Sequence, residues 1–163
     1  AQGLRAGEII RHLRDLVRKH PSAQTTLDLN ALIGAVVHYA QLELHQAQVT
    51  VRQELAESLP LVLADDLQIQ LVVLYLMRNA IEAMSETRDG PRELTLRTVL
   101  LKDDTVLTTV HDTGQGLGAA TTEQLFQAFF TTKPNGMGLG LSVSRSIVES
   151  QNEIGRASCR ERV

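Results

Sequence analysis

The sequence predicts an α+β fold, a two-layer sandwich in which helices cover one face of a mixed, mostly antiparallel sheet. Segments with helical apolar periodicity are interspersed with segments in which apolar and polar residues alternate. The alternating segments 93–101 and 105–112 flank a short loop, which predicts an antiparallel hairpin. With 163 residues, 43% of them hydrophobic, the chain is long enough for one domain with its own core.

The remaining elements follow from the same periodicities. We expect helices at 4–20, 30–46, 66–85 and from about Gly138 onward. We expect further strands at 25–29 and 49–55. Pro21 ends the first helix, and either Asp28 or Asn30 can cap the second. The third helix is apolar through LVVLYLM and should lie at the centre of the domain.

Composition excludes several classes of protein. The formal net charge is −3 and no basic block is present, so we expect no nucleic-acid partner. No apolar run approaches the roughly 20 residues that cross a bilayer, and nothing resembles a signal peptide. One cysteine cannot form an internal disulfide. We therefore expect a cytoplasmic location. If the chain is part of a longer protein, we leave open whether that protein is anchored in a membrane.

Both ends of the chain are expected to be cut. Residues 153–163, EIGRASCRERV, have no apolar period and carry three arginines and the single cysteine. They match the translation of a common short-read sequencing adapter, so we interpret them as an artefact; a charged, frayed tail is the alternative. The chain also lacks an initial Met and opens inside a helical pattern. We expect a fragment truncated at both ends.

An asparagine within the apolar third helix is the first candidate for chemistry. Asn79 lies in LMRNAIEAM, and a buried, unsatisfied amide costs about 1–3 kcal/mol. The alternative is that Asn79 caps a backbone group or faces solvent. Glu82 follows three residues later on nearly the same face and is a candidate for a neighbouring polar contact.

A carboxylate followed by glycines is the second candidate. Asp112 ends a predicted strand, and Gly114 and Gly116 follow it. A carboxylate at a strand end can accept a hydrogen bond from the exocyclic amine of a base, and the glycines allow a tight turn over a ligand. An ordinary Asx turn explains the same residues.

The segment FQAFFTTKPNGMGLGLS is the third candidate and the most informative. Gly136, Gly138 and Gly140 alternate as they run into a helix, whose N-terminal N–H groups favour an anion such as a triphosphate. Lys133 can neutralise phosphate charge. The alternatives are ordinary glycine turns and a small hydrophobic cluster of the three phenylalanines.

The order of these motifs resembles the ATP-binding fold shared by sensor histidine kinases, gyrase-type topoisomerases, Hsp90 chaperones and MutL-type repair proteins. Among them, FFTTK–GMGLGLS and the N-terminal EIIRHLRDLVRK are similar to bacterial two-component sensor histidine kinases, in particular the oxygen-sensing and dicarboxylate-sensing kinases. The resemblance covers residues 4–151.

The resemblance implies a role for each motif, with ATP and Mg²⁺ as ligands. Asn79 would ligate Mg²⁺ and act in catalysis together with Lys133, with Glu82 beside them, while Asp112 would bind the adenine amine above Gly114 and Gly116. The remaining ATP contacts would come from the mobile lid and the glycine loop: Phe126, Thr131, Thr132, Gly136, Met137, Gly138, Leu139 and Gly140. Phosphoryl transfer needs mainly positioning and charge neutralisation, which such groups supply.

The resemblance also implies an organisation and partners. Residues 1–20 would be the end of the second helix of a dimerisation and phosphoacceptor hairpin. Residues 21–152 would be the catalytic ATP-binding domain, without its last strands. The partners would be the phosphoacceptor-histidine domain of a homodimeric parent kinase and the receiver domain of a response regulator.

Two departures from the family pattern affect the predicted function. Tyr75 stands one turn before Asn79, where these kinases usually carry a second Asn and the ATP-hydrolysing relatives a Glu. None of the five histidines has the context of a phosphoacceptor: His12, His20, His38, His45 and His111. We expect transfer of the ATP γ-phosphate to a histidine outside this chain. The alternatives are a nucleotide-binding regulatory module without transfer activity and a gyrase-like or Hsp90-like ATPase, which Tyr75 disfavours.

Overall fold

The computed structural model describes residues 24–85, 90–102, 104–116, 118, 121–131 and 138–151. The helix predicted at 4–20 and the tail at 153–163 lie outside these ranges. So do four of the predicted ligand-binding residues: Thr132, Lys133, Gly136 and Met137.

The described strands form a three-stranded sheet and a two-stranded one. The larger sheet has the order β2-β4-β5 and consists of β2 (Thr50–Glu54), β4 (Glu93–Leu100) and β5 (Val106–Asp112). β2 pairs with β4 in parallel, and β4 pairs with β5 as the predicted antiparallel hairpin. The smaller sheet pairs β1 (Thr25–Leu27) with β3 (Val62–Ala64) antiparallel. The alternation patterns alone did not predict β3.

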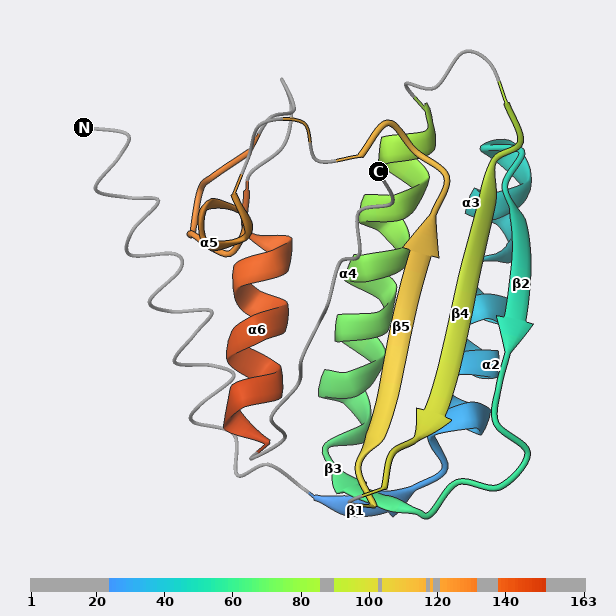
Figure 1. Ribbon diagram of the computed structural model, residues 1–163, viewed down its shortest axis with the longest axis vertical. Coiled ribbons are helices and arrows are strands. Elements are labelled where there is room, and N and C mark those ends of the chain that lie inside the picture. The colour runs from blue at the N-terminus through green and yellow to red at the C-terminus, as the bar shows by residue number, and fades with distance from the viewer. Residues whose placement is uncertain are drawn as a thin grey trace.

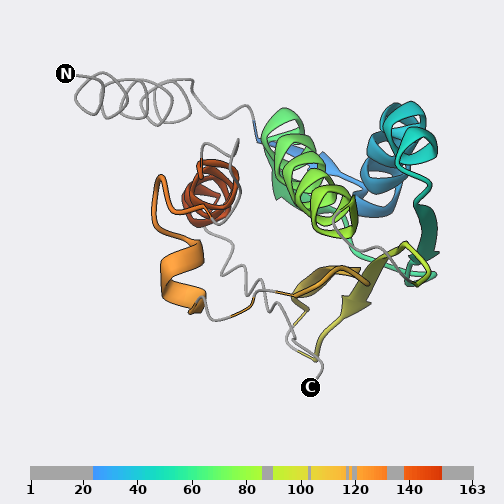
Figure 2. The ribbon, with the colours of Figure 1, turned by 90° about the horizontal axis from the view of Figure 1, so that it is seen from above.

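The described residues form the helices α2 (Leu29–Tyr39), α3 (Gln41–Gln46), α4 (Asp66–Ser85), α5 (Thr122–Leu125) and α6 (Gly140–Ser150). Figure 1 shows α2, α3 and α4 behind the three-stranded sheet, with α6 beside α4. Figure 2 shows from above that these helices lie on the same side of the sheet. The predicted α+β fold is therefore confirmed. Among the described residues, no helix combines the length and apolar character needed to cross a bilayer.

The region predicted as one helix at 30–46 is divided into two. Asp28 caps α2 as expected, because its Oδ1 accepts from the N–H groups of Asn30 at 2.9 Å and Ala31 at 3.1 Å. The prediction of a continuous helix is wrong at Ala40, which ends α2 and precedes α3. Ala40, at the division, and Leu44 of α3 are both buried in the core. Tertiary packing therefore overrides a helical pattern that contains no local break.

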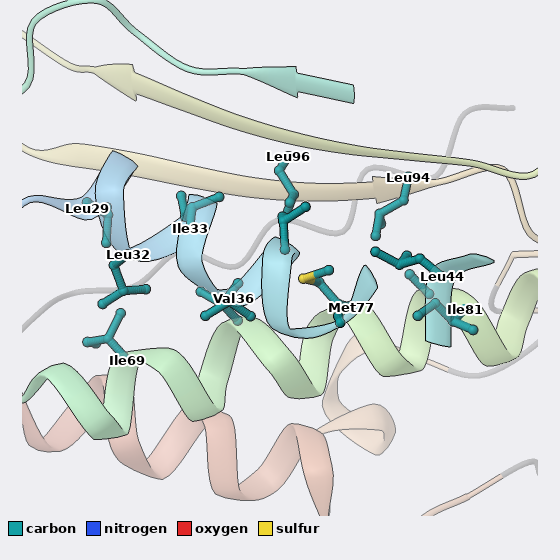
Figure 3. Packing of buried hydrophobic residues seen from close by; sticks show 14 of the residues in the cluster. Leu29, Leu32, Ile33, Val36, Leu44, Ile69, Met77, Ile81, Leu94 and Leu96 are labelled. Carbon is teal, nitrogen blue, oxygen red and sulfur yellow. The ribbon is translucent and has the colours of Figure 1, made fainter. Parts of the chain in front are cut away.

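The main core fills the space between the helices and the larger sheet (Figure 3). Its fully buried side chains include Ile33 of α2, Met77 and Met84 of α4, and Leu94 and Leu96 of β4. Helix α4 is the central helix, as predicted, because one of its faces packs on this core while another faces α6. Helix α6 lies on the side of α4 away from the core.

A closed set of hydrogen bonds holds the connection after β2. The hydroxyl of Thr98, on β4, donates to Oδ1 of Asn30 at 2.9 Å and accepts from the N–H of Ala56 at 3.0 Å. Nδ2 of Asn30 donates to the carbonyl oxygen of Ala56 at 2.8 Å. Thr98 is almost completely buried, so these bonds replace the water that its hydroxyl loses on folding.

Candidate functional site

Asn79 of α4 lies against the first turn of α6. A Cβ atom at Gly140 would be 3.8 Å from Nδ2 of Asn79 and 3.8 Å from Cδ1 of Tyr75. The start of α6 therefore lies within van der Waals contact of these two residues, at a distance that a Cβ atom would also tolerate. Asn79 is half-buried, and within the described ranges its amide has no side-chain hydrogen bond. The capping role considered as an alternative for Asn79 is thus not found in this part of the chain.

The Asp112 loop approaches the same helix one turn further along. Oδ1 of Asp112 accepts from the N–H of Gly114 at 2.8 Å, so the loop does contain an Asx turn. A Cβ atom at Gly114 would be 2.7 Å from that oxygen and 2.9 Å from the backbone and Cβ of Ala83. Only glycine fits between them without a shift. Since Ala83 follows Asn79 by one turn, α4 carries both parts of the candidate site about 6 Å apart along its axis.

Thr113 connects this loop to the sheet by hydrogen bonds, a role that the sequence analysis did not predict. Its hydroxyl donates to the carbonyl oxygen of Pro91 at 2.6 Å and accepts from the N–H of Glu93 at 3.0 Å. The end of β5 is thereby tied to the chain that enters β4. The pattern gave no signal for it, because a threonine after an aspartate is unremarkable without knowing that Pro91 lies opposite.

The phenylalanine segment and the glycine loop meet in space. The N–H of Phe129 donates to the carbonyl oxygen of Gly138 at 2.9 Å. Gly138 has φ +65°, and a Cβ atom there would be 2.5 Å from the carbonyl carbon of Phe129. Phe126 lies under the guanidinium of Arg145 of α6, 5.5 Å from Cζ to the ring centroid. The phenylalanines do not join the main core: Phe129 is 46% exposed.

Helix α6 begins at Gly140, two residues later than predicted, with Leu139 as the residue before it. Leu139 provides no side-chain cap, so the first N–H groups of α6 have no partner of that kind. This is the arrangement in which a helix N-terminus accepts an anion.

The other predicted residues are less central or lie outside the described ranges. Glu82 is on α4 with an exposed side chain, and Gly116 has φ +75° and open space around it. Thr131 is exposed at the end of the phenylalanine segment. The structure thus brings together Asn79, Gly138, Leu139 and Gly140, and links the Asp112 loop to them through α4.

No ready-made metal cage is found in the described part of the chain, where no three His, Cys, Asp or Glu side chains cluster. Mg²⁺ commonly binds through one or two protein oxygens together with waters and substrate phosphates. The amide oxygen of Asn79, beside a helix N-terminus, suits that coordination.

This fold and arrangement define a class of ATP-binding protein. The family of histidine kinase-, DNA gyrase B- and HSP90-like ATPases matches residues 64–163, and the chain belongs to it. Within the family, the chain has the fold and sequence of the ATP-binding catalytic domain of sensor histidine kinases, as the individual relatives show.

Two curated relatives illustrate the match. The sensor protein FixL of Bradyrhizobium diazoefficiens is 43% identical over 149 residues, which cover 91% of this chain and 29% of FixL. The C4-dicarboxylate transport sensor protein DctS of Rhodobacter capsulatus is 36% identical over 152 residues, covering 91% of this chain and 22% of DctS. The chain therefore spans less than a third of the length of these relatives. The predicted resemblance to sensor kinases of this kind is confirmed.

Two solved structures of a histidine kinase resemble the chain in fold and in sequence. The catalytic domain of the histidine kinase ThkA is 33% identical with a TM-score of 0.64, covering 78% of this chain and 81% of that domain. ThkA in complex with the response regulator protein TrrA gives 26% identity and a TM-score of 0.67, covering 93% of this chain and 42% of that one.

Proposed function

We propose that this chain binds Mg²⁺–ATP between α4, the Asp112 loop and the start of α6, and donates the γ-phosphate to a histidine on a separate helix of its parent kinase. The observation that carries the proposal is the approach of two glycines to one helix: Gly140 to Asn79, and Gly114 to Ala83 one turn further on. A nucleotide has its base and its phosphates at opposite ends, and this helix would support the base-binding group at one position and the phosphate-binding group at the other.

The base would bind at the Asp112 loop. The carboxylate would accept a hydrogen bond from the adenine amine. Its oxygen Oδ1 is already held by the N–H of Gly114, so the side chain is oriented before the base arrives. Gly114 and Gly116 would form the floor beside the base, because neither places a side chain there.

The phosphates would bind at the start of α6. Gly138 and Gly140 would present backbone without side chains to the ligand, and the first N–H groups of α6 would donate to phosphate oxygens. On the sequence resemblance alone, Gly136, Met137 and Leu139 would complete the loop, and Lys133 would add a positive charge. Phe126, Thr131 and Thr132 would belong to the lid over the nucleotide.

A metal ion would be held by the amide oxygen of Asn79 and by the phosphates themselves, with Glu82 nearby on α4. When bound, Mg²⁺ would neutralise part of the phosphate charge that develops during transfer. Asn79 would contribute by fixing the position of the phosphates relative to the acceptor.

The same proposal includes partners and location. The parent would be a homodimer whose phosphoacceptor-histidine domain receives the phosphate, and a response regulator receiver domain would take it afterwards. ThkA, a solved relative, is seen with its response regulator TrrA, which supports this kind of partner. We place the domain in the cytoplasm.

Tyr75 favours a second candidate, a nucleotide-binding module without transfer activity. Its ring packs beside Gly140 at the phosphate end, where the histidine kinases usually offer a second amide. A phenol is bulkier than an amide and a poorer Mg²⁺ ligand, so nucleotide binding can persist while transfer is slow.

The test compares binding first and transfer second. A fluorescent ATP analogue with Mg²⁺ is titrated into the chain, into Asp112→Asn and into Asp104→Asn, a matched change in the exposed hairpin loop. We expect Asp112→Asn to weaken binding at least about tenfold and Asp104→Asn to leave it unchanged. If the unsubstituted chain is folded and does not bind the analogue, the proposal is contradicted.

The second step separates the two candidates. With γ-labelled ATP and an acceptor hairpin from a related kinase, label on the hairpin histidine supports the kinase. Binding without label supports the module.

A further inference from the structure

Helices α4 and α6 pack antiparallel in one defined register. At one end, Nε2 of Gln151 donates to Oε1 of Gln68 at 2.7 Å. At the other end, Gly140 lies against Asn79. Eleven residues separate Gln68 from Asn79 on α4, and eleven separate Gly140 from Gln151 at the α6 end. The two contacts are therefore opposite ends of one aligned interface, roughly 16 Å long at helical rise (Figure 1).

The apolar part of this interface is small. Ile147 is the only buried apolar side chain of α6, and neither it nor Val72 of α4 belongs to the main core cluster. Gly140 and Ser144 share the helical spacing of Ile147 and offer little side chain to interlock, while Leu141, Val143 and Val148 are half-buried. With one fully buried apolar side chain on α6, a buried directional contact can add to the specification of its register.

The glutamine pair is directional and almost completely buried. Gln68 is 8% exposed and Gln151 is 4% exposed. Oε1 of Gln151 also accepts from the N–H of Asp65 at 3.1 Å, so one amide contacts both the start of α4 and a side chain in its first turn. A displaced register would leave these amides unpaired away from water, which is costly. A single buried polar contact fixes register in this way in coiled coils.

We infer that Gln68 and Gln151 are positioning residues for the phosphate end of the nucleotide site. By fixing the far end of α6, they hold its N-terminal turn beside Asn79; each residue of slippage would move that turn by about 1.5 Å along α4. The Asp112 loop approaches α4 independently of α6, through Gly114 and Ala83, so base binding does not depend on the pair. The inference rests on the proposed ATP-binding function.

The experiment compares affinity for Mg²⁺–ATP with affinity for adenosine, which has the base but no phosphates. The main variant replaces both glutamines, Gln68→Leu with Gln151→Leu, so that neither glutamine amide is left buried without the other. The part-buried N–H of Asp65 also loses its acceptor in this variant. The control is Gln70→Leu, on the same helix, where the amide donates to Asp66 in an exposed contact. We expect ATP affinity to fall roughly tenfold in the leucine pair, while adenosine affinity stays near that of the unsubstituted chain. The urea unfolding midpoint should fall only modestly, because the N–H of Asp65 is part-buried and water can replace its lost acceptor.

A milder variant covers the case in which the leucine pair does not fold. Gln68→Asn keeps the amide but shortens its reach, and Gln70→Asn is its control. We expect the ratio of ATP affinity to adenosine affinity to fall in Gln68→Asn alone. The inference would be overturned by a folded variant of either kind in which the ratio of ATP affinity to adenosine affinity is unchanged. This includes a variant in which both affinities fall by the same factor. If the unsubstituted chain binds neither ATP nor adenosine, that result would instead contradict the proposed function.

Discussion

The N–H of Phe129 donates to the carbonyl oxygen of Gly138 at 2.9 Å, which joins the phenylalanine segment to the start of the helix that follows the glycine loop. The backbone of Phe130 also packs closely against Gly138, since its carbonyl oxygen would be 2.6 Å from a Cβ atom there. Phe129 itself has φ +70°, a left-handed conformation that non-glycine residues seldom adopt. The phenylalanine segment and the residues just before α6 are therefore held together at one point.

Gly138→Ala is expected to separate the phenylalanine segment from the start of α6. The new methyl group would collide with backbone atoms of Phe129 and Phe130, and the left-handed φ adds strain. Affinity for Mg²⁺–ATP should fall at least about tenfold in a fluorescence titration. The unfolding midpoint should change little, because neither phenylalanine belongs to the main core.

Gly118→Ala is the matched control. Gly118 has φ +59°, but a Cβ atom there meets nothing within 4 Å, so the substitution adds strain without a collision. The substitution should lower the free energy of unfolding by about 1–2 kcal/mol at most and leave ATP affinity close to that of the unsubstituted chain. Equal losses of affinity in the two variants would contradict the steric explanation.

Thr113→Val is expected to loosen the Asp112 loop. The carbonyl oxygen of Pro91 and the N–H of Glu93 would both lose their partner. Because Thr113 is exposed, water can replace part of what is lost, and we expect about 1 kcal/mol of destabilisation by urea unfolding. Thr113→Ser keeps the hydroxyl and should restore most of the stability. A serine variant as unstable as the valine variant would argue against the hydrogen bonds.

Thr98→Val is expected to lower the free energy of unfolding by more, about 2 kcal/mol, because Thr98 is 2% exposed and the change leaves the N–H of Ala56 and Oδ1 of Asn30 without their partner. The control is Thr95→Val on the other face of β4, which should stay within about 0.5 kcal/mol of the parent. Urea unfolding measures both. Similar values for the two would mean that the hydrogen-bonded set contributes no net stability.

Ser144→Ala is expected to stabilise the protein. Among the described residues, Oγ of Ser144 is buried and has no hydrogen-bond partner. Removing it should gain about 1 kcal/mol of unfolding free energy. Alanine also has the higher helix propensity, so Ser146→Ala serves as the control: its hydroxyl donates to the carbonyl oxygen of Ser142 at 3.0 Å. If the two variants gained equally, propensity alone would explain the effect.

Local patterns predicted much of this fold. The cap at Asp28, the hairpin of β4 and β5, and the long central helix α4 depend on spacing within short stretches of chain. The motifs at Asn79 and Asp112 could be recognised because polar groups and glycines stand out in apolar surroundings. Their order along the chain then pointed to a family.

Features that depend on distant segments were not predictable in this way. β3 exists because it pairs with β1, across more than thirty residues. The division at Ala40 has no breaking residue and follows from the packing of Leu44. Gln68 and Gln151 are 83 residues apart, and two glutamines on helix faces look like solvent-exposed positions until the helices are placed side by side.

The Asx turn at Asp112 has a consequence for recognition. One carboxylate oxygen is already bonded to the N–H of Gly114, so the side chain loses its rotational freedom during folding rather than during binding. In the proposed site the other oxygen can only accept a hydrogen bond. Adenine offers an amine there, whereas guanine would present a carbonyl oxygen and leave two acceptors facing each other. A rigid acceptor of this kind distinguishes the two purines by repulsion as well as by attraction.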